Sequence, residues 1–127
     1  MLDAPIFKLA KDSPKLVSLL TDEASQIFKV FEFGLAPQEI KPPYVVHQLI
    51  SGAPSQSLAC RPSYEMQLVQ VDCYAATAAD AKAVHQALED ALEVWASINS
   101  YKQTTIDADT GLFRRGFDVS FFLPRPR

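Results

Sequence analysis

The chain has few of the residues from which phosphate-binding loops and metal sites are built. Its 127 residues include four glycines, two cysteines and two histidines. Phosphate cradles need glycine-rich loops, whereas these glycines are scattered at positions 34, 52, 111 and 116. Cys60 and Cys73 are separated by twelve residues, without a C-x-x-C pair or a histidine at zinc-binding spacing. We therefore expect no nucleotide-binding loop and no zinc site, and we interpret Cys73, which alternates with Val69 and Val71, as a buried apolar thiol.

Long hydrophobic runs are also missing. A membrane-spanning helix needs roughly 20 apolar residues, and no segment approaches that length. The N-terminal Met1-Leu-Asp-Ala-Pro5 lacks the positive region and the apolar run of a signal peptide. We therefore expect the protein to be made and used in a reducing cytoplasm, or in an assembly built there, without a membrane partner.

Basic residues are in the minority. Twelve Lys and Arg face fifteen Asp and Glu, which gives a net charge of -3, whereas domains that grip nucleic-acid phosphates are usually basic. The C-terminal end differs locally, because four arginines there face only Asp118: Arg114, Arg115, Arg125 and Arg127. We interpret them as solvated surface, while a local basic patch stays an alternative. The apolar fraction of 48% and the charged fraction of 21% are typical of a single globular domain, residues 1–127.

Two short helices are predicted at the N-terminus. Pro5 suits the first turn of a helix over residues 4–11. Ser13 is a good N-cap and Pro14 suits the first helical position, so a second helix is expected to continue to Leu20.

Two strands separated by a proline-marked loop are predicted next. Residues 27–33 and 44–50 are rich in apolar, β-branched and aromatic side chains, which favours strands. Prolines at positions 37, 42 and 43 favour an ordered, extended loop between them. Residues 55–63 are polar and are expected to form an exposed loop.

The longest predicted strand leads into the longest predicted helix. The strand covers residues 64–75, and a bulge or bend is expected near Leu68-Val69, where the apolar face changes side. Thr77-Ala-Ala-Asp80 is a helix-capping pattern that begins a helix over 78–97. The apolar stripe of this helix comprises Ala81, Val84, Leu88, Ala91, Leu92 and Trp95.

A hairpin completes the predicted fold. Strands over 101–107 and 112–123 are joined by Asp109-Thr-Gly111, where glycine supplies a positive φ. Phe117 and Phe121 share a face of the last strand, which we expect to meet the apolar stripe of the long helix. The predicted class is α+β: an antiparallel (mixed) sheet of about five strands, packed by one long helix, with short N-terminal helices.

No group of residues announces an active site. The window from Asp107 to Asp118 carries acidic residues at positions 1, 3 and 12, as in a calcium loop, but Leu112 stands where glycine is required. His47 and His85 lie on different elements, and neither belongs to an H-E-x-x-H motif. The strand-to-helix turn also lacks the G-x-S-x-G of a hydrolase. We predict no catalytic, cofactor-binding or metal-binding residues, while a Ser-His-Asp arrangement assembled in space stays an alternative.

Several short stretches occur in a particular order along nearly the whole chain. They are Ala4-Pro5-Ile6-Phe7, Ala36-Pro37-Gln38, Pro42-Pro43-Tyr44-Val45-Val46, Ile50-Ser51-Gly52, and Val69-Gln-Val-Asp-Cys-Tyr74 before an alanine-rich helix. In this order and spacing the chain resembles the tail-completion proteins of long-tailed phages and prophages, a group that includes tail terminators and tail-to-head joining proteins. The C-terminal Pro124–Arg127 has no counterpart in the resemblance.

The resemblance implies an α+β subunit, without catalytic residues or cofactor, that forms a ring at the head-proximal end of the tail tube. The ring is expected to be a hexamer that stops tube polymerisation and docks to the head. The implied partners are further copies of the chain, the major tail tube protein and a head-completion or connector protein, while DNA only passes through the channel. The implied location is the virion tail, after assembly in the bacterial host cytoplasm. The expected interface residues are Pro37, Gln38, Pro42, Tyr44, Gln56, Arg61, Arg114 and Arg115.

Two functions of other classes stay open. A small α+β enzyme or ligand-binding domain would be a monomer or dimer with a deep apolar pocket between helix and sheet. A nucleic-acid-binding accessory protein would show salt-dependent affinity for DNA, although Phe113-Arg-Arg-Gly-Phe117 favours core packing over base stacking. Ring formation, together with neighbouring capsid and tail genes, distinguishes the tail protein from both.

Overall fold

The computed structural model describes residues 3–54 and 64–124. Along these residues the helices and strands are α1 Ile6–Lys11, α2 Pro14–Leu20, β1 Val30–Glu32, β2 Tyr44–Pro54, β3 Tyr64–Ala75, α3 Ala78–Glu93, β4 Ser97–Tyr101, β5 Thr105–Ile106 and β6 Phe113–Pro124. None of these helices is long and apolar enough to cross a membrane. The α+β class predicted from the sequence is therefore confirmed.

The strands form a single mixed sheet. Their order is β1-β2-β3-β6-β4, and β5 pairs with β6 beyond the end of β4. β1 runs parallel to β2, because the loop over residues 33–43 returns the chain to the end at which β1 began. The other pairings are antiparallel. The sheet has six strands instead of about five, because residues 97–106 contribute two short strands rather than one.

Both predicted helix caps are present. The Ser13 hydroxyl accepts a hydrogen bond from the Leu16 amide at 3.3 Å, and Pro14 follows in the first turn of α2. The Thr77 hydroxyl accepts from the Asp80 amide at 3.1 Å and begins α3. Each cap satisfies an amide that the helix itself leaves unpaired, which typically contributes about 1 kcal/mol.

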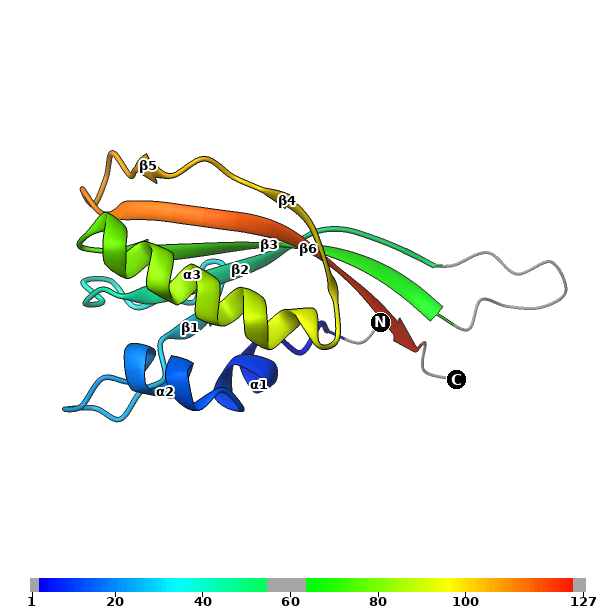
Figure 1. Cartoon of the computed structure of the whole chain (residues 1–127), viewed down its shortest axis with the longest axis horizontal. Helices are drawn as coiled ribbons and strands as arrows, with labels where there is room; N and C mark the ends of the chain where they lie inside the picture. Colours follow the sequence, from blue (N-terminus) through cyan, green and yellow to red (C-terminus); the bar gives the residue numbers. More distant parts are fainter. Residues whose placement is uncertain (1–2, 55–63, 125–127) are drawn as a thin grey trace, which may run out of the picture.

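The helices form one layer and the sheet a second, as Figure 1 shows. α3 crosses β3 and β6, and α1 and α2 pack beside α3, so the core lies between α3 and one face of the sheet. Cys73 is fully buried there, as predicted, and burial raises the pKa of its thiol. The core also holds Ile6, Leu16, Leu20, Val45, Val69, Val71, Val84, Leu88, Leu92, Phe117, Val119 and Phe121.

The prediction that Trp95 packs on the sheet is wrong. α3 ends at Glu93 rather than near residue 97, and Trp95 is 69% exposed. Residues 97–101 pair with β6 as β4, so the chain must leave the helix before Trp95 can face the core. The rest of the predicted packing is confirmed, because Leu88, Phe117 and Phe121 are buried.

Two strands differ from their predicted lengths. β1 covers only Val30–Glu32, whereas β2 continues through the predicted turn to Pro54. The irregularity expected on β3 lies instead on β2, between Leu49 and Ser51, opposite Val69 and Leu68. β3 runs unbroken because its buried face accepts polar residues at its start, where the Gln67 amide donates to the Glu65 carboxylate at 3.0 Å.

Beyond α3 the sheet continues as a three-stranded arm, which extends to the right in Figure 1. We define the arm as residues 48–54 of β2, 64–69 of β3 and 119–124 of β6. β1 pairs with β2 only at Val45–His47, and β4 pairs with β6 only up to Ser120. Within the described residues, both outer strands of the arm therefore have a free edge.

Candidate functional site

The end of the sheet opposite the arm carries two loops that face one another, and we call it the loop end. The proline-marked loop over residues 34–43 and the hairpin over 107–112 together border a hollow of about 450 Å³. The Lys29 ammonium, which is buried, donates a 3.0 Å hydrogen bond to the Lys41 carbonyl and fastens the loop to β1. Burial lowers the pKa of Lys29. One border of the hollow is thus a loop that a buried hydrogen bond holds in place.

The hairpin has the turn chemistry predicted for it. Gly111 has a φ of +71°, and its amide donates to the Asp107 carbonyl at 2.8 Å. The Asp107 carboxylate accepts from the Thr110 amide at 3.1 Å and from its hydroxyl at 2.7 Å. In the window that resembles a calcium loop, the first carboxylate, that of Asp107, is therefore already hydrogen-bonded within the turn.

An aromatic and ionic stack lies beside the hollow on the face of the sheet away from the helices. The Tyr44 and Tyr74 rings stack with centroids 4.9 Å apart, and the Arg114 guanidinium lies 6.0 Å from the Tyr74 ring centre. Arg114 also donates to the Asp72 carboxylate at 3.2 Å, which Gln70 contacts at 2.8 Å. Burial raises the pKa of both tyrosines, so they present neutral phenols.

Gly116 allows this stack to approach the backbone. A Cβ at this position would overlap the Asp72 carboxylate and would lie 2.7 Å from the Val71 carbonyl. Asp72 can therefore lie flat over β6 and hold Arg114 only because residue 116 has no side chain.

The structure brings five of the eight predicted interface residues together and separates one, while two lie outside the described residues. Pro37, Gln38, Pro42 and Tyr44 line the loop-end hollow, and Arg114 lies beside it. Arg115 points to the opposite, helix-covered face. Gln56 and Arg61 lie outside the described residues. Sequence reasoning missed three members of the site, Tyr74, Thr110 and Leu112, which the register of β2, β3 and β6 brings to the same end.

Arg115 belongs to a cluster that joins α3 to the sheet. Its guanidinium donates to His85 Nδ1 at 3.0 Å, and His85 Nε2 lies 3.4 Å from the Glu89 carboxylate. The Tyr101 hydroxyl hydrogen-bonds to Glu89, and the His85 ring packs on the Phe117 ring at 4.9 Å. Burial and then the Arg115 charge lower the pKa of His85, so the imidazole is held neutral.

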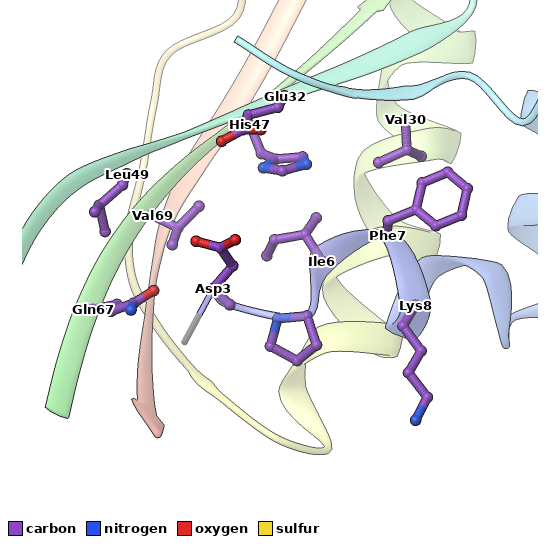
Figure 2. A pocket seen from close by; sticks show the side chains of 12 residues that line it. Asp3, Ile6, Phe7, Lys8, Val30, Glu32, His47, Leu49, Gln67 and Val69 are labelled. Carbon is purple, nitrogen blue, oxygen red and sulfur yellow. The ribbon is translucent and has the colours of Figure 1, made fainter. Parts of the chain in front are cut away.

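A second hollow, of about 470 Å³, lies between the start of α1 and strands β1 to β3 (Figure 2). Its walls are mainly apolar, and Asp3, Glu32 and His47 stand around it. Burial lowers the pKa of His47, although the negative charges of Glu32 and Asp3 act to raise it. The described lining includes no serine, threonine or cysteine beside this histidine. Among the described residues, no three His, Cys, Asp or Glu side chains are grouped to hold a metal ion.

Large apolar side chains are exposed along two opposite edges of the sheet. Leu49, Ile50 and Phe122, which lie in the arm, are 45%, 46% and 63% exposed. On or beside the β1–β2 edge, the described exposed residues are Phe7, Ile27, Phe33, Leu35, Leu49 and Ile50, and along the β4–β6 edge they are Tyr101, Ile106 and Phe122. Apart from these, Val94 and Trp95 are exposed at the end of α3.

Comparison with known proteins agrees with the resemblance noted in the sequence. The family model described as tail completion protein gp17 matches residues 4–123. No curated protein matches the chain significantly. The family match covers all of the strands and helices described above except the last residue of β6. The chain therefore belongs to the tail completion protein gp17 family, whose members are structural proteins of bacteriophage tails.

Proposed function

We propose that this tail completion protein forms a ring on the head-proximal end of the tail tube, where it ends tube polymerisation and joins the tail to the head. The observation that carries the ring is the placement of exposed apolar side chains along two different edges of the sheet. Extended apolar surface of this kind marks protein–protein contacts. The family match supports a structural role in the tail.

The two edges favour contact between unlike surfaces. Along the β1–β2 edge, β2 has no outer partner strand from Gln48 onwards in the described residues, and Leu49 and Ile50 are exposed there. The β4–β6 edge offers the free backbone of β6 from Phe121, with Phe122 exposed. A head-to-tail contact between two different edges generates a closed ring when the rotation closes. Free strand edges are suited to such pairing.

The loop end suits an axial partner. It lies at the opposite end of the strands from the arm, so ring contacts through the arm leave it free to meet a neighbour along the tail axis. Its stacked tyrosines and half-exposed Arg114 are residue types enriched at interface centres. We assign this end to the tail tube protein or the head connector. The net charge of -3 suits a channel that DNA crosses without being gripped. No catalytic activity is assigned.

Paired edge variants test the ring. Ile50→Asp blocks one edge and Phe122→Asp the other, so neither variant alone should form rings, as seen by native mass spectrometry and electron microscopy. A mixture of the two retains one intact pair of edges and should stop at dimers. Lys82→Asp, on the exposed side of α3, is the matched control and should assemble normally. Rings formed by either edge variant would contradict this assembly.

Tail assembly tests the role of the ring. In a phage or prophage system that depends on this protein, edge variants should yield overlong or headless tails. Normal-length tails that join heads efficiently, with a well-folded Phe122→Asp variant as the only copy, would exclude the termination role.

A further inference from the structure

The end of α3 carries an exposed apolar surface that belongs neither to the loop end nor to the two sheet edges. Val94 is 72% and Trp95 is 69% exposed, although both directly follow a helix whose apolar stripe is buried. With Leu9 and Ala91 they line a hollow of about 220 Å³ between α3 and the α1–α2 junction, where Asp12 also stands. We call this the α3-end surface.

Its electrostatics favour a cationic occupant. Glu89, Asp90 and Glu93 stand in the last turns of α3, and the last turn contains no basic residue, although a helix C-terminus favours cations. Partial desolvation, a hydrogen bond with Glu89 and the nearby negative charges raise the pKa of Glu93. Among the described residues, no lysine or arginine forms an ion pair with these carboxylates. On neighbouring α1, Lys11 instead lies over the Phe28 ring at 5.0 Å.

A cationic segment of the same chain starts nearby. β6 is described as far as Pro124, and the sequence continues as Arg125-Pro-Arg127. The start of β4 is fixed beside β6, because Ser97 pairs with Ser120, and Trp95 precedes Ser97 by two residues. The four residues of β6 that follow Ser120 cover about 13 Å. A segment of three further residues after Pro124 spans up to about 10 Å. Figure 1 shows α3 and β6 ending towards the same end of the molecule.

We propose that the Arg125–Arg127 segment binds the α3-end surface of its own chain, with one guanidinium over the Trp95 ring and the other between the Asp90 and Glu93 carboxylates. Arginine suits both positions, because its planar guanidinium stacks on indole and pairs with carboxylates. The prolines at 124 and 126 restrict the free segment and reduce the entropy lost on binding. The contact fixes the end of β6 to the helix layer.

Trp95 is the only tryptophan of the chain, so its fluorescence reports on this surface alone. In the full-length variant Arg125→Gln/Arg127→Gln, the acrylamide quenching constant of Trp95 should rise, because no guanidinium then covers the indole ring. High salt should raise quenching in the wild-type protein and change the variant much less. Lys82→Gln removes one positive charge at the start of α3 and serves as the control, with no change expected.

The acceptor side is tested by Asp90→Asn/Glu93→Gln, which should increase Trp95 quenching in the same direction. Circular dichroism checks that each variant is folded. Unchanged quenching in the folded arginine variant would overturn the proposal. A difference between wild type and variant that disappears on dilution would also overturn it, because the segment would then bind another copy. Neither result bears on ring formation, which is measured separately.

Discussion

The loop end and the arm are opposite ends of the same three strands, yet they differ in how many of their groups are paired within the chain. At the loop end, three polar side chains have partners in their own chain: Lys29 holds the loop, Asp107 closes the hairpin, and Asp72 holds Arg114. In the arm, β2 and β6 have free edges, and Ile50 and Phe122 are exposed.

Among the described residues, the difference shows which end of the subunit has polar side chains held within its own chain and which end has free strand edges. A surface whose side chains are already held in place loses little freedom on binding and can present a fixed shape. An edge with unpaired backbone and exposed apolar side chains is stable in water but gains when another chain covers it. This contrast supports the proposal that the loop end recognises a fixed partner and that the arm mediates self-assembly.

The largest expected contrast lies along β6. Phe117→Ala removes a fully buried ring and should lower the free energy of unfolding by about 4 kcal/mol. Phe122→Ala removes a 63% exposed ring and should change it by less than about 0.5 kcal/mol, while weakening assembly. Urea unfolding of the dilute protein measures both. A large loss of stability in Phe122→Ala would show that the arm is already packed in the monomer.

Gly116→Ala tests how tightly the loop end is packed. The new methyl group would overlap the Asp72 carboxylate and the Val71 carbonyl, which should lower the free energy of unfolding by about 3 kcal/mol. Gly111→Ala, in open space at positive φ, is the matched control and should cost about 1 kcal/mol. Equal costs in urea unfolding would mean that the Asp72 contact relaxes freely.

Acid should loosen the helix layer through His85. Its pKa is lowered in the folded protein, so below pH 6.5 the unfolded chain binds the proton more readily than the folded one. The free energy of unfolding should therefore fall as pH drops below 6.5, by at most about 1.4 kcal/mol per pH unit for one proton. His47 contributes with the same sign, because its pKa is also lowered.

The measurement compares urea midpoints between pH 7.5 and pH 5 for the wild type and for His85→Gln. The variant should show a weaker pH dependence in this range. An unchanged dependence would assign the effect to His47 or to the carboxylates.

Much of the fold was predictable because local signals agreed with tertiary packing. The Thr77 cap, the buried alternation around Val71 and the glycine of the hairpin each act within a few residues, and the structure confirms all three. Trp95 shows the limit. It continues the helical stripe of Leu88 and Leu92, and nothing local reveals that the next residues are needed as an edge strand.

The candidate site was predictable only in part, for a related reason. Residues over 37–44 and Arg114 were expected at an interface and lie at the loop end. Tyr74 and Thr110 join them through strand register, a long-range property that the sequence pattern does not reveal. Whether these residues contact a partner stays a prediction.

Arg114→Gln should change stability only slightly and separates recognition from folding. The ion pair with Asp72 is partly exposed, with 38% of the Arg114 side chain accessible, so its loss should lower the free energy of unfolding by less than about 1 kcal/mol. If the loop end docks an axial partner, the same change should reduce head joining about tenfold, as expected for a central interface arginine. Arg115→Gln is the control in the next residue: it leaves His85 Nδ1 without its donor, so it should cost about 1–3 kcal/mol in stability without a specific defect in joining. Normal joining by a folded Arg114→Gln protein would move the axial contact away from the loop end.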